Sequence, residues 1–269
     1  MATRNKYRQQ YLRWHSTYEK RATKELRTVF KKWVKNVDWD NLQAGSYTFV
    51  LNNSFDIKEL ERAYFNIYYN IGVVHGKRVG KGINLSLKSF IPDVFISLFE
   101  RNVREWLRTF GAVKIKTVRQ SFFEYIVELI SNQLENRQDM RTIAKEIQKE
   151  VNRPDFYRWQ AERIARTEST GASNYAALQA GEASGFEMVK EWISATDKRT
   201  RKKPQDEYDH LEMNGKTIDL KEKFGFNNGD DLLDYPADPT GEAGNIINCR
   251  CTIAVIAKRD KNGMLIPKI

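Results

Sequence analysis

GNIINCRCTIAV, residues 244–255, contains both cysteines of the chain, Cys249 and Cys251, separated by one residue. The β-branched residues that follow them are typical of a strand, and in a strand positions 249 and 251 point to the same face. A disulfide between positions i and i+2 would close a very small ring and strain the backbone. We therefore consider three interpretations of the thiol pair: half of a site for a soft metal ion, two small apolar core residues, or a redox pair.

The composition is ordinary for a globular protein. Of the 269 residues, 41% are hydrophobic and 30% are charged, and this length allows one large core or two smaller ones. No apolar run is long enough to span a membrane, and the N-terminus is basic and polar. We therefore expect neither a membrane span nor a secretory signal. Two cysteines do not make a disulfide framework, which favours synthesis in a reducing cytoplasm.

Positive charge is concentrated in the N-terminal half. Residues 1–150 carry 27 Lys and Arg against 16 Asp and Glu, whereas residues 151–269 carry 18 against 19. A polyanion or an acidic protein surface is therefore the expected neighbour of the N-terminal half.

Hydrophobic residues recur at three- and four-residue steps through most of the first 183 residues, which predicts a helical, basic region over residues 1–150. Gly111 is expected to cap one of these helices at its C-terminus. Residues 45–51 are predicted to form a short strand or an extended linker. The helices are predicted over residues 8–37, from residue 57 onward, and over residues 92–111, 117–136, 139–151 and 155–183.

The pattern changes after Gly185. Short runs with strand character at residues 187–194, 215–220 and 251–257 alternate with loops rich in Gly, Pro, Asn and Asp. Residues 151–269 are therefore predicted to form a small domain in which one long helix packs on a small sheet. The expected fold class is α+β, with a long-helix N-terminal region followed by this small α+β domain.

Sequence signatures of several enzyme classes are absent. The chain has no G-x-x-x-x-G-K-[ST], no H-E-x-x-H and no G-x-S-x-G, and its three histidines are scattered. We therefore expect a protein that is not an enzyme and has no catalytic residues.

Five short segments of the C-terminal half follow one another in a characteristic order and spacing. In this order they resemble the C-terminal domain of the phage Mu protein F-like family, the minor head or head-morphogenesis proteins of tailed phages, over roughly residues 140–257. The chain departs from the family pattern in the extra residues 202–209, which leave the geometry between Arg201 and His210 open. The segments are RIARTEST (163–170), KEWISATDKRTR (190–201), DHLEMNG (209–215), YPADP (235–239) and NCRCT (248–252).

The resemblance implies a minor capsid protein made in the host bacterial cytoplasm and located in the virion, inside the capsid near the portal vertex. The implied partners are the phage portal protein, the capsid interior and packaged double-stranded DNA, with roles in head morphogenesis and DNA packaging. It implies no cofactor-driven reaction.

The polar residues of these segments are expected to fix loops. Arg163 and Arg166 share one face of a helix and could anchor it to the sheet, and Asp197 could hold the guanidinium groups of Arg199 and Arg201. Asn214 with the following glycine predicts a turn. The full set expected to be structural is Arg163, Arg166, Glu168, Trp192, Asp197, Arg199, Arg201, His210, Asn214, Gly215, Asn248, Cys249, Arg250 and Cys251.

His210, Cys249 and Cys251 are the candidate ligands of a metal ion. Three ligands leave a tetrahedral structural site incomplete unless Asp197, Asp209 or another carboxylate completes it. We therefore expect no cofactor, with both thiols reduced at the centre of the small domain, where they tie the last strand to the His210 loop. Bound zinc is the alternative.

The helix over residues 8–37 is expected to carry a basic face opposite an aromatic stripe. The stripe is predicted to pack in the core or against a partner helix. The basic face is predicted to contact DNA phosphates or an acidic portal surface, and deletion of residues 1–36 is expected to leave the C-terminal domain folded. The cations of this face are Arg13, Lys20, Arg21, Lys24, Arg27, Lys31 and Lys32.

Two other classes of protein stay open at this point. One is a metal-dependent nuclease or toxin domain, built on the group formed by Asp197, His210 and the two thiols. The other is a freestanding protein that binds DNA without sequence specificity through the basic helix alone.

Overall fold

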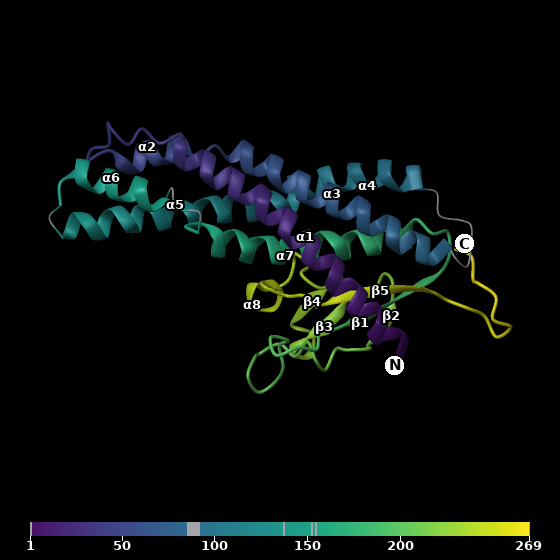
Figure 1. Cartoon of the computed structure of the whole chain (residues 1–269). Coiled ribbons are helices and arrows are strands. Elements are labelled where there is room, and N and C mark those ends of the chain that lie inside the picture. The colour runs from purple at the N-terminus through teal and green to yellow at the C-terminus, as the bar shows by residue number, and fades with distance from the viewer. Residues whose placement is uncertain (1, 85–91, 137, 152, 154, 269) are drawn as a thin grey trace.

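The computed structural model describes residues 2–84, 92–136, 138–151, 153 and 155–268. Long helices run side by side in its upper part, and small strands lie together below them, next to α7 and the beginning of α1 (Figure 1). The predicted α+β class is confirmed, with a region of long helices followed by small antiparallel sheets.

The helices lie close to their predicted positions. Helix α1 begins earlier than predicted and crosses the molecule from the sheet to the far end of the helical part (Figure 1). Among the described helices, none combines the length and the apolar character needed to cross a membrane. Their bounds are α1 (Ala2–Lys35), α2 (Tyr47–Ser54), α3 (Ile57–Asn84), α4 (Pro92–Trp106), α5 (Ala112–Glu135), α6 (Met140–Val151), α7 (Arg158–Glu182) and α8 (Ala243–Ile246), with a π-helical turn over Leu107–Gly111.

Small residues make α7 the central element of the fold. Helix α7 packs against α1 and α3 on one side and against β5 on the other. A Cβ atom at Gly181 would lie 2.6 Å from Cγ1 of Val255, so glycine permits the close approach of this helix to the sheet. The fully buried small residues of α7 are Ala161, Ala165, Ser169, Thr170, Ala172, Ser173, Ala176, Ala177 and Ala180.

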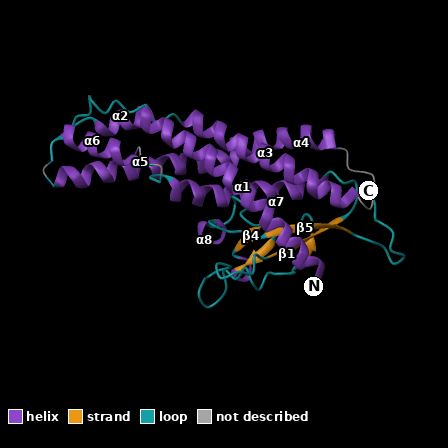
Figure 2. Ribbon diagram, in the orientation of Figure 1, coloured by secondary structure: helices purple, strands orange, loops and turns teal. Residues whose placement is uncertain are grey.

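The strands form two antiparallel sheets on one side of the helices, drawn in orange in Figure 2. The larger sheet has the order β2-β1-β5, and β3 pairs with β4. Trp192 of β1 is fully buried and contacts Phe224 and Phe226 edge-on, so it joins the two sheets. The strands are β1 (Met188–Ile193), β2 (Thr217–Asp219), β3 (Phe224–Phe226), β4 (Asp231–Leu233) and β5 (Thr252–Ala257).

The prediction of a strand or linker over residues 45–51 is wrong, because residues 47–51 belong to α2. Its aromatic and β-branched residues favour a strand locally. Leu51 is fully buried, however, and Tyr47 and Val50 pack against the same core at helical spacing. The hydroxyl group of Tyr47 also bonds the hydroxyl group of Ser131 on α5 at 3.1 Å. Tertiary packing therefore overrides the local preference.

The prediction that Gly111 caps a helix is also wrong. The chain stays helical from α4 through the π-helical turn into α5, and Gly111 has right-handed helical angles. A Cβ atom at this position would lie 2.9 Å from Cδ2 of Leu107 and 3.1 Å from the Trp106 ring. Glycine is therefore needed here for close packing, not for chain reversal.

The aromatic stripe of α1 is part of the helical core, as predicted. Tyr11, Tyr18, Leu26, Phe30 and Trp33 are at most 1% exposed. Burying such a stripe against α3, α5 and α7 is what joins α1 to the bundle.

Candidate functional site

The first turns of α1 lie on the C-terminal sheet and not apart from it. Arg8 donates through Nε to the carbonyl oxygen of Ser194 at 2.7 Å and through Nη2 to Oδ1 of Asn214 at 3.1 Å. Arg4 forms an ion pair with Glu191 of β1. The N-terminal helix therefore contacts both parts of the molecule.

Asn214 and Gly215 form the turn that their sequence predicts. Gly215 has φ +94°, a conformation that favours glycine, and its N–H donates to the carbonyl oxygen of Trp192 at 2.8 Å. Oδ1 of Asn214 also accepts the N–H of Ser194 at 3.1 Å. The turn is thus fixed between β1 and the first turns of α1.

These contacts bear on the expectation that the C-terminal domain stays folded when residues 1–36 are deleted. The deletion would remove Arg8 from the sheet and would take Phe30 and Trp33, both fully buried, out of the helical core. Large cavities and exposed apolar surface would result. The deletion is therefore expected to destabilise both parts of the chain, and point substitutions are the sharper test of the basic face.

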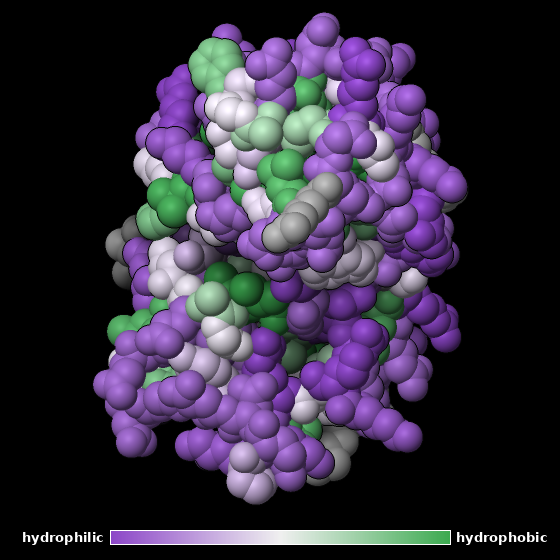
Figure 3. Space-filling model, turned by 90° about the vertical axis from the view of Figure 1, so that its left-hand side faces the viewer, coloured by the Kyte–Doolittle hydropathy of each residue, from purple (hydrophilic) through white to green (hydrophobic). Residues whose placement is uncertain are grey.

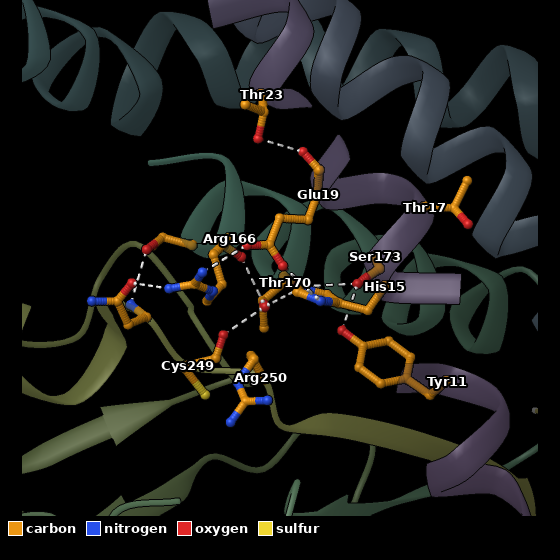
Figure 4. A network of polar contacts seen from close by, with 12 residues as sticks. Tyr11, His15, Thr17, Glu19, Thr23, Arg166, Thr170, Ser173, Cys249 and Arg250 are labelled. Carbon is orange, nitrogen blue, oxygen red and sulfur yellow. Dashed lines mark hydrogen bonds and ion pairs between the residues drawn. The ribbon is translucent and has the colours of Figure 1, made fainter. Parts of the chain in front are cut away.

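A ladder of polar contacts joins α1 to α7 (Figure 4). Three side chains at successive turns of α1 each bond a side chain of α7, so the two helices are held in one register. The pairs are Tyr11 with Ser173 at 3.0 Å, His15 with Thr170 at 2.9 Å and Glu19 with Arg166 at 2.8 Å.

The same face of α7 holds residues 247–251, which we call the thiol loop. Thr170 donates its hydroxyl hydrogen to the carbonyl oxygen of Cys249 at 2.7 Å, and Arg166 donates to Oδ1 of Asn248 at 3.0 Å. Oγ1 of Thr167 accepts the N–H of Asn248, which has φ +61°. Arg166 and Thr167 thus fix Asn248 of the thiol loop to α7.

Asn174 is a further residue of this site that the sequence did not single out. Its Nδ2 donates to the carbonyl oxygen of Cys251 at 3.1 Å, and its Oδ1 accepts the N–H of Ile253 at 2.9 Å. At the start of β5, this buried side-chain amide thus bonds backbone groups that a neighbouring strand would otherwise bond. A signal exists in the sequence, because Thr167, Thr170 and Asn174 are polar residues at helical spacing within an otherwise small and apolar helix.

Two histidines are buried here, His15 of the ladder and His75 on the neighbouring helix α3. Burial lowers the pKa of His15 from its ordinary 6.5 to about 4, and the positive charge of Arg166 acts in the same direction. Burial lowers the pKa of His75 from 6.5 to about 3, and Arg78 adds to this. Both imidazoles are therefore neutral at neutral pH, and they pack as core side chains.

Asp197 fixes its loop through a different arginine from the two that the sequence suggested. In the described structure its carboxylate pairs with Arg250 at 2.6 Å, and Arg199 contributes only its backbone N–H, at 2.9 Å. Arg201 instead donates to the carbonyl oxygen of Ile247 at 2.6 Å. Burial raises the pKa of Asp197. The bonds from Arg250 and from the Arg199 N–H outweigh this and hold that pKa below its ordinary value. The sequence includes Arg250 in the structural set but does not indicate its pairing with Asp197.

His210 and the two thiols come together at the centre of the small domain. Nδ1 of His210 lies 3.6 Å from Sγ of Cys249 and 3.5 Å from Sγ of Cys251, and each of the three residues is 2% exposed. Neither Asp197 nor Asp209 joins this cluster among the described residues. The suggestion that one of these carboxylates completes a four-ligand site is therefore wrong.

Arg163 and Glu168 point away from the sheet. Glu168 is 4% exposed and accepts a hydrogen bond from Tyr68 at 2.8 Å and from Lys114 at 3.1 Å. Arg163 is exposed and lies over the ring of Trp159 at 5.5 Å. Of the two arginines expected to anchor α7 to the sheet, Arg166 bonds Asn248 of the thiol loop, which precedes the strand β5.

A pocket of 360 Å³ opens beside Glu168, between α5, α7 and residues 239–247. It is lined mainly by apolar side chains, with Lys114 and Arg163 as its cationic groups. On the face drawn in Figure 3, apolar side chains gather in a furrow across the middle of the molecule.

The basic face of α1 divides into two parts. Lys20, Lys24, Arg27 and Lys31 line a hollow of 400 Å³, which Arg153 completes from the segment before α7. The sequence could not place Arg153 there, because it lies far along the chain. Of the other predicted cations, Arg13 and Arg21 are exposed outside the hollow, and Lys32 pairs with Glu59 of α3. Lys32 therefore has the acidic partner that the sequence did not predict.

The C-terminal part is thus an α+β domain in which one long helix holds a small sheet and a thiol-bearing loop through buried polar bonds. Residues 124–254 match the family model described as phage Mu protein F like protein. The chain therefore contains a Phage Mu protein F-like domain, of a family associated with phage head morphogenesis. The matched region begins within α5, earlier than the sequence motifs indicated.

A curated relative is similar to the chain over a longer stretch. The uncharacterized protein YqbB of Bacillus subtilis (strain 168) is 20% identical over 170 residues, which are 63% of this chain and 53% of that protein. The chain therefore spans about half the length of this relative. The comparison with solved structures gave no significant match.

Proposed function

We propose that the protein is a minor head protein of a tailed bacteriophage, with a structural role in head morphogenesis. It binds the portal protein or the inner surface of the capsid near the portal vertex, and its basic face contacts packaged double-stranded DNA. It is made in the host bacterial cytoplasm and becomes part of the virion. The observation that carries this proposal is the Phage Mu protein F-like domain over residues 124–254.

The bonding of the domain's polar residues supports a structural role over a catalytic one. Arg166, Thr170 and Asn174 are all engaged with the thiol loop or β5. Asp197 is held by Arg250. Side chains that already satisfy one another in the folded chain stabilise loops, whereas a catalytic group is aimed at a space that a substrate can enter.

The hollow on α1 supports contact with a polyanion. Four cations of α1 and Arg153 face one concave surface, and phosphate groups along a DNA backbone bind such surfaces without regard to sequence. An acidic surface of the portal would bind the same charges, so an experiment has to distinguish DNA from the portal as the partner.

Two rival functions stay as alternatives. A metal-dependent nuclease or toxin would use the cluster around His210, and a freestanding DNA-binding protein would use the basic face of α1 without any capsid partner. The first rival predicts metal-dependent cleavage of nucleic acid that disappears in His210→Ala. The second predicts salt-sensitive DNA binding by a protein that does not join heads.

The deciding experiment measures incorporation into heads. The tagged protein is produced together with portal and capsid proteins, and purified heads and portal rings are probed for it. We expect co-purification with the portal and reduced incorporation of Asp197→Ala, with Asp230→Ala, an exposed aspartate, as the matched control. Absence of the wild-type protein from both portal rings and heads would overturn the proposal.

A further inference from the structure

His210, Cys249 and Cys251 present three ligand atoms to one point. These atoms lie within 4.8 Å of one another, and Nδ1 of His210 is 3.5 Å and 3.6 Å from the two sulfur atoms. In a tetrahedral zinc site, with sulfur at about 2.3 Å and nitrogen at about 2.0 Å from the ion, a sulfur and a nitrogen ligand are about 3.5 Å apart. The distances from Nδ1 of His210 to the two sulfur atoms fit that geometry.

A chain of hydrogen bonds turns the correct nitrogen of His210 toward the sulfur atoms. Asn245 donates through Nδ2 to Oδ2 of Asp231 at 2.7 Å, which directs its Oδ1 toward Nε2 of His210 at 2.6 Å. Because Oδ1 can only accept, Nε2 carries the hydrogen and Nδ1 keeps its lone pair. Histidines that bind metal ions are oriented by bonds of this kind from their other nitrogen.

The surroundings of the cluster are dry and fixed. The ring of His210 lies edge-on to Trp192 at 5.5 Å and close to Phe226 at 5.3 Å. The N–H of Cys251 donates to Sγ of Cys249 at 3.4 Å, a contact that suits a thiolate ligand. Two sulfur atoms and one imidazole favour a borderline soft cation such as zinc over magnesium or calcium.

We propose that His210 Nδ1, Cys249 Sγ and Cys251 Sγ bind a structural zinc ion that cross-links the His210 loop to the thiol loop. No fourth protein ligand joins them among the described residues. The ion would hold together two segments that the helices also contact. Helix α7 bonds the thiol loop, and α1 bonds Asn214 beside the His210 loop. This proposal does not depend on the proposed role in phage heads.

The test uses the full-length wild-type protein, expressed with zinc in the medium and purified without chelator. We expect near-stoichiometric zinc by elemental analysis, sulfur-to-cobalt charge-transfer absorption after exchange with Co²⁺, and a lower midpoint of thermal unfolding after treatment with a strong chelator. Protein that contains no zinc, gives no cobalt absorption and unfolds at the same temperature with chelator would overturn the proposal. Stoichiometric copper in place of zinc would overturn the identity of the ion.

Variants separate the site from general stability. Cys251→Ser and His210→Gln should lose bound zinc and the effect of chelator on the unfolding midpoint. The matched control is His75→Gln, which changes another buried histidine that lies outside the cluster and should keep the zinc. If the cluster variants fail to fold, the metal content and cobalt spectrum of the wild type still decide.

Discussion

Oγ1 of Thr170, in the middle of α7, donates a hydrogen bond of 2.7 Å to the carbonyl oxygen of Cys249. The same hydroxyl group lies 2.9 Å from Nε2 of His15, so one side chain connects α1, α7 and the thiol loop. Because it is fully buried, water cannot replace either partner when it is removed.

Thr170→Val should therefore destabilise the protein while preserving the shape of the side chain. The unsatisfied partners should lower the free energy of unfolding by about 1–3 kcal/mol, measured by urea denaturation. Thr17→Val is the control, since Thr17 is exposed on α1 and should change stability by less than about 0.5 kcal/mol. Equal effects of the two substitutions would contradict the importance of this contact.

Glycines on α3 give a second prediction. A Cβ atom at Gly72 would lie 2.1 Å from the ring of Phe99, and one at Gly76 would lie 2.1 Å from the ring of Phe95. Gly72→Ala should therefore displace α4 from α3 and cost about 1–3 kcal/mol of unfolding free energy.

The matched control is on the same helix. A Cβ atom at Gly82 would have no neighbouring atom within 4 Å, so Gly82→Ala should be neutral or should stabilise α3 by about 0.5–1 kcal/mol through its higher helix propensity. Thermal or urea unfolding of both variants checks the pair. A stabilising Gly72→Ala would show that α3 and α4 do not pack this closely.

The two neutral histidines predict that acid destabilises the protein. The unfolded chain binds protons near pH 6.5, whereas His15 and His75 in the folded chain have pKa values of about 4 and about 3. Their contribution is therefore fully present above pH 6.5 and is lost as the pH falls toward the folded values. Between pH 7.5 and pH 5 each should remove about 2 kcal/mol from the free energy of unfolding.

His75→Phe tests the assignment. The ring of His75 is surrounded by Tyr11, Trp14 and Tyr18, so phenylalanine should fit while removing one of the two titrating groups. Urea denaturation at several pH values should show about half the dependence of the wild type over this range. An unchanged dependence would mean that other groups cause the acid effect.

The sequence predicts the helices well because each carries a clear apolar periodicity, and α1 is the best example. It misassigns residues 45–51, since the burial of Leu51 in the helical core is a tertiary effect that local propensity does not contain. It also cannot predict that Gly111 is placed for contact with Trp106, because a glycine at that point of a helix equally suggests a cap.

For the site, motif order predicts the residues but not their partners. His210, Cys249 and Cys251 do converge, although the two thiols lie in the loop before β5 and not within the strand that the sequence suggested. The pairing of Asp197 with Arg250 depends on how the loops cross, which spacing along the chain does not contain. Lys190 is fully buried beside Phe224, although its position in β1 gives no sign of this in the sequence.

The hollow on α1 gives the last prediction, for the contact with DNA. Lys20, Lys24 and Lys31 line it together with Arg27 and Arg153. If these charges meet phosphates, the intact protein should bind duplex DNA weakly and without sequence preference. Its affinity should fall steeply with salt, because each neutralised phosphate releases about 0.9 counterions.

Substitution of these three lysines by glutamine should flatten that salt dependence. The slope of log K against log salt concentration should decrease by roughly three, measured by fluorescence anisotropy with a short duplex. The control replaces Lys116, Lys221 and Lys261, three exposed lysines outside the hollow, and changes the net charge by the same amount. If both triple variants reduce this slope by the same amount, the net charge governs binding and the hollow does not. If neither variant changes it, the basic face of α1 faces an acidic protein surface instead of DNA.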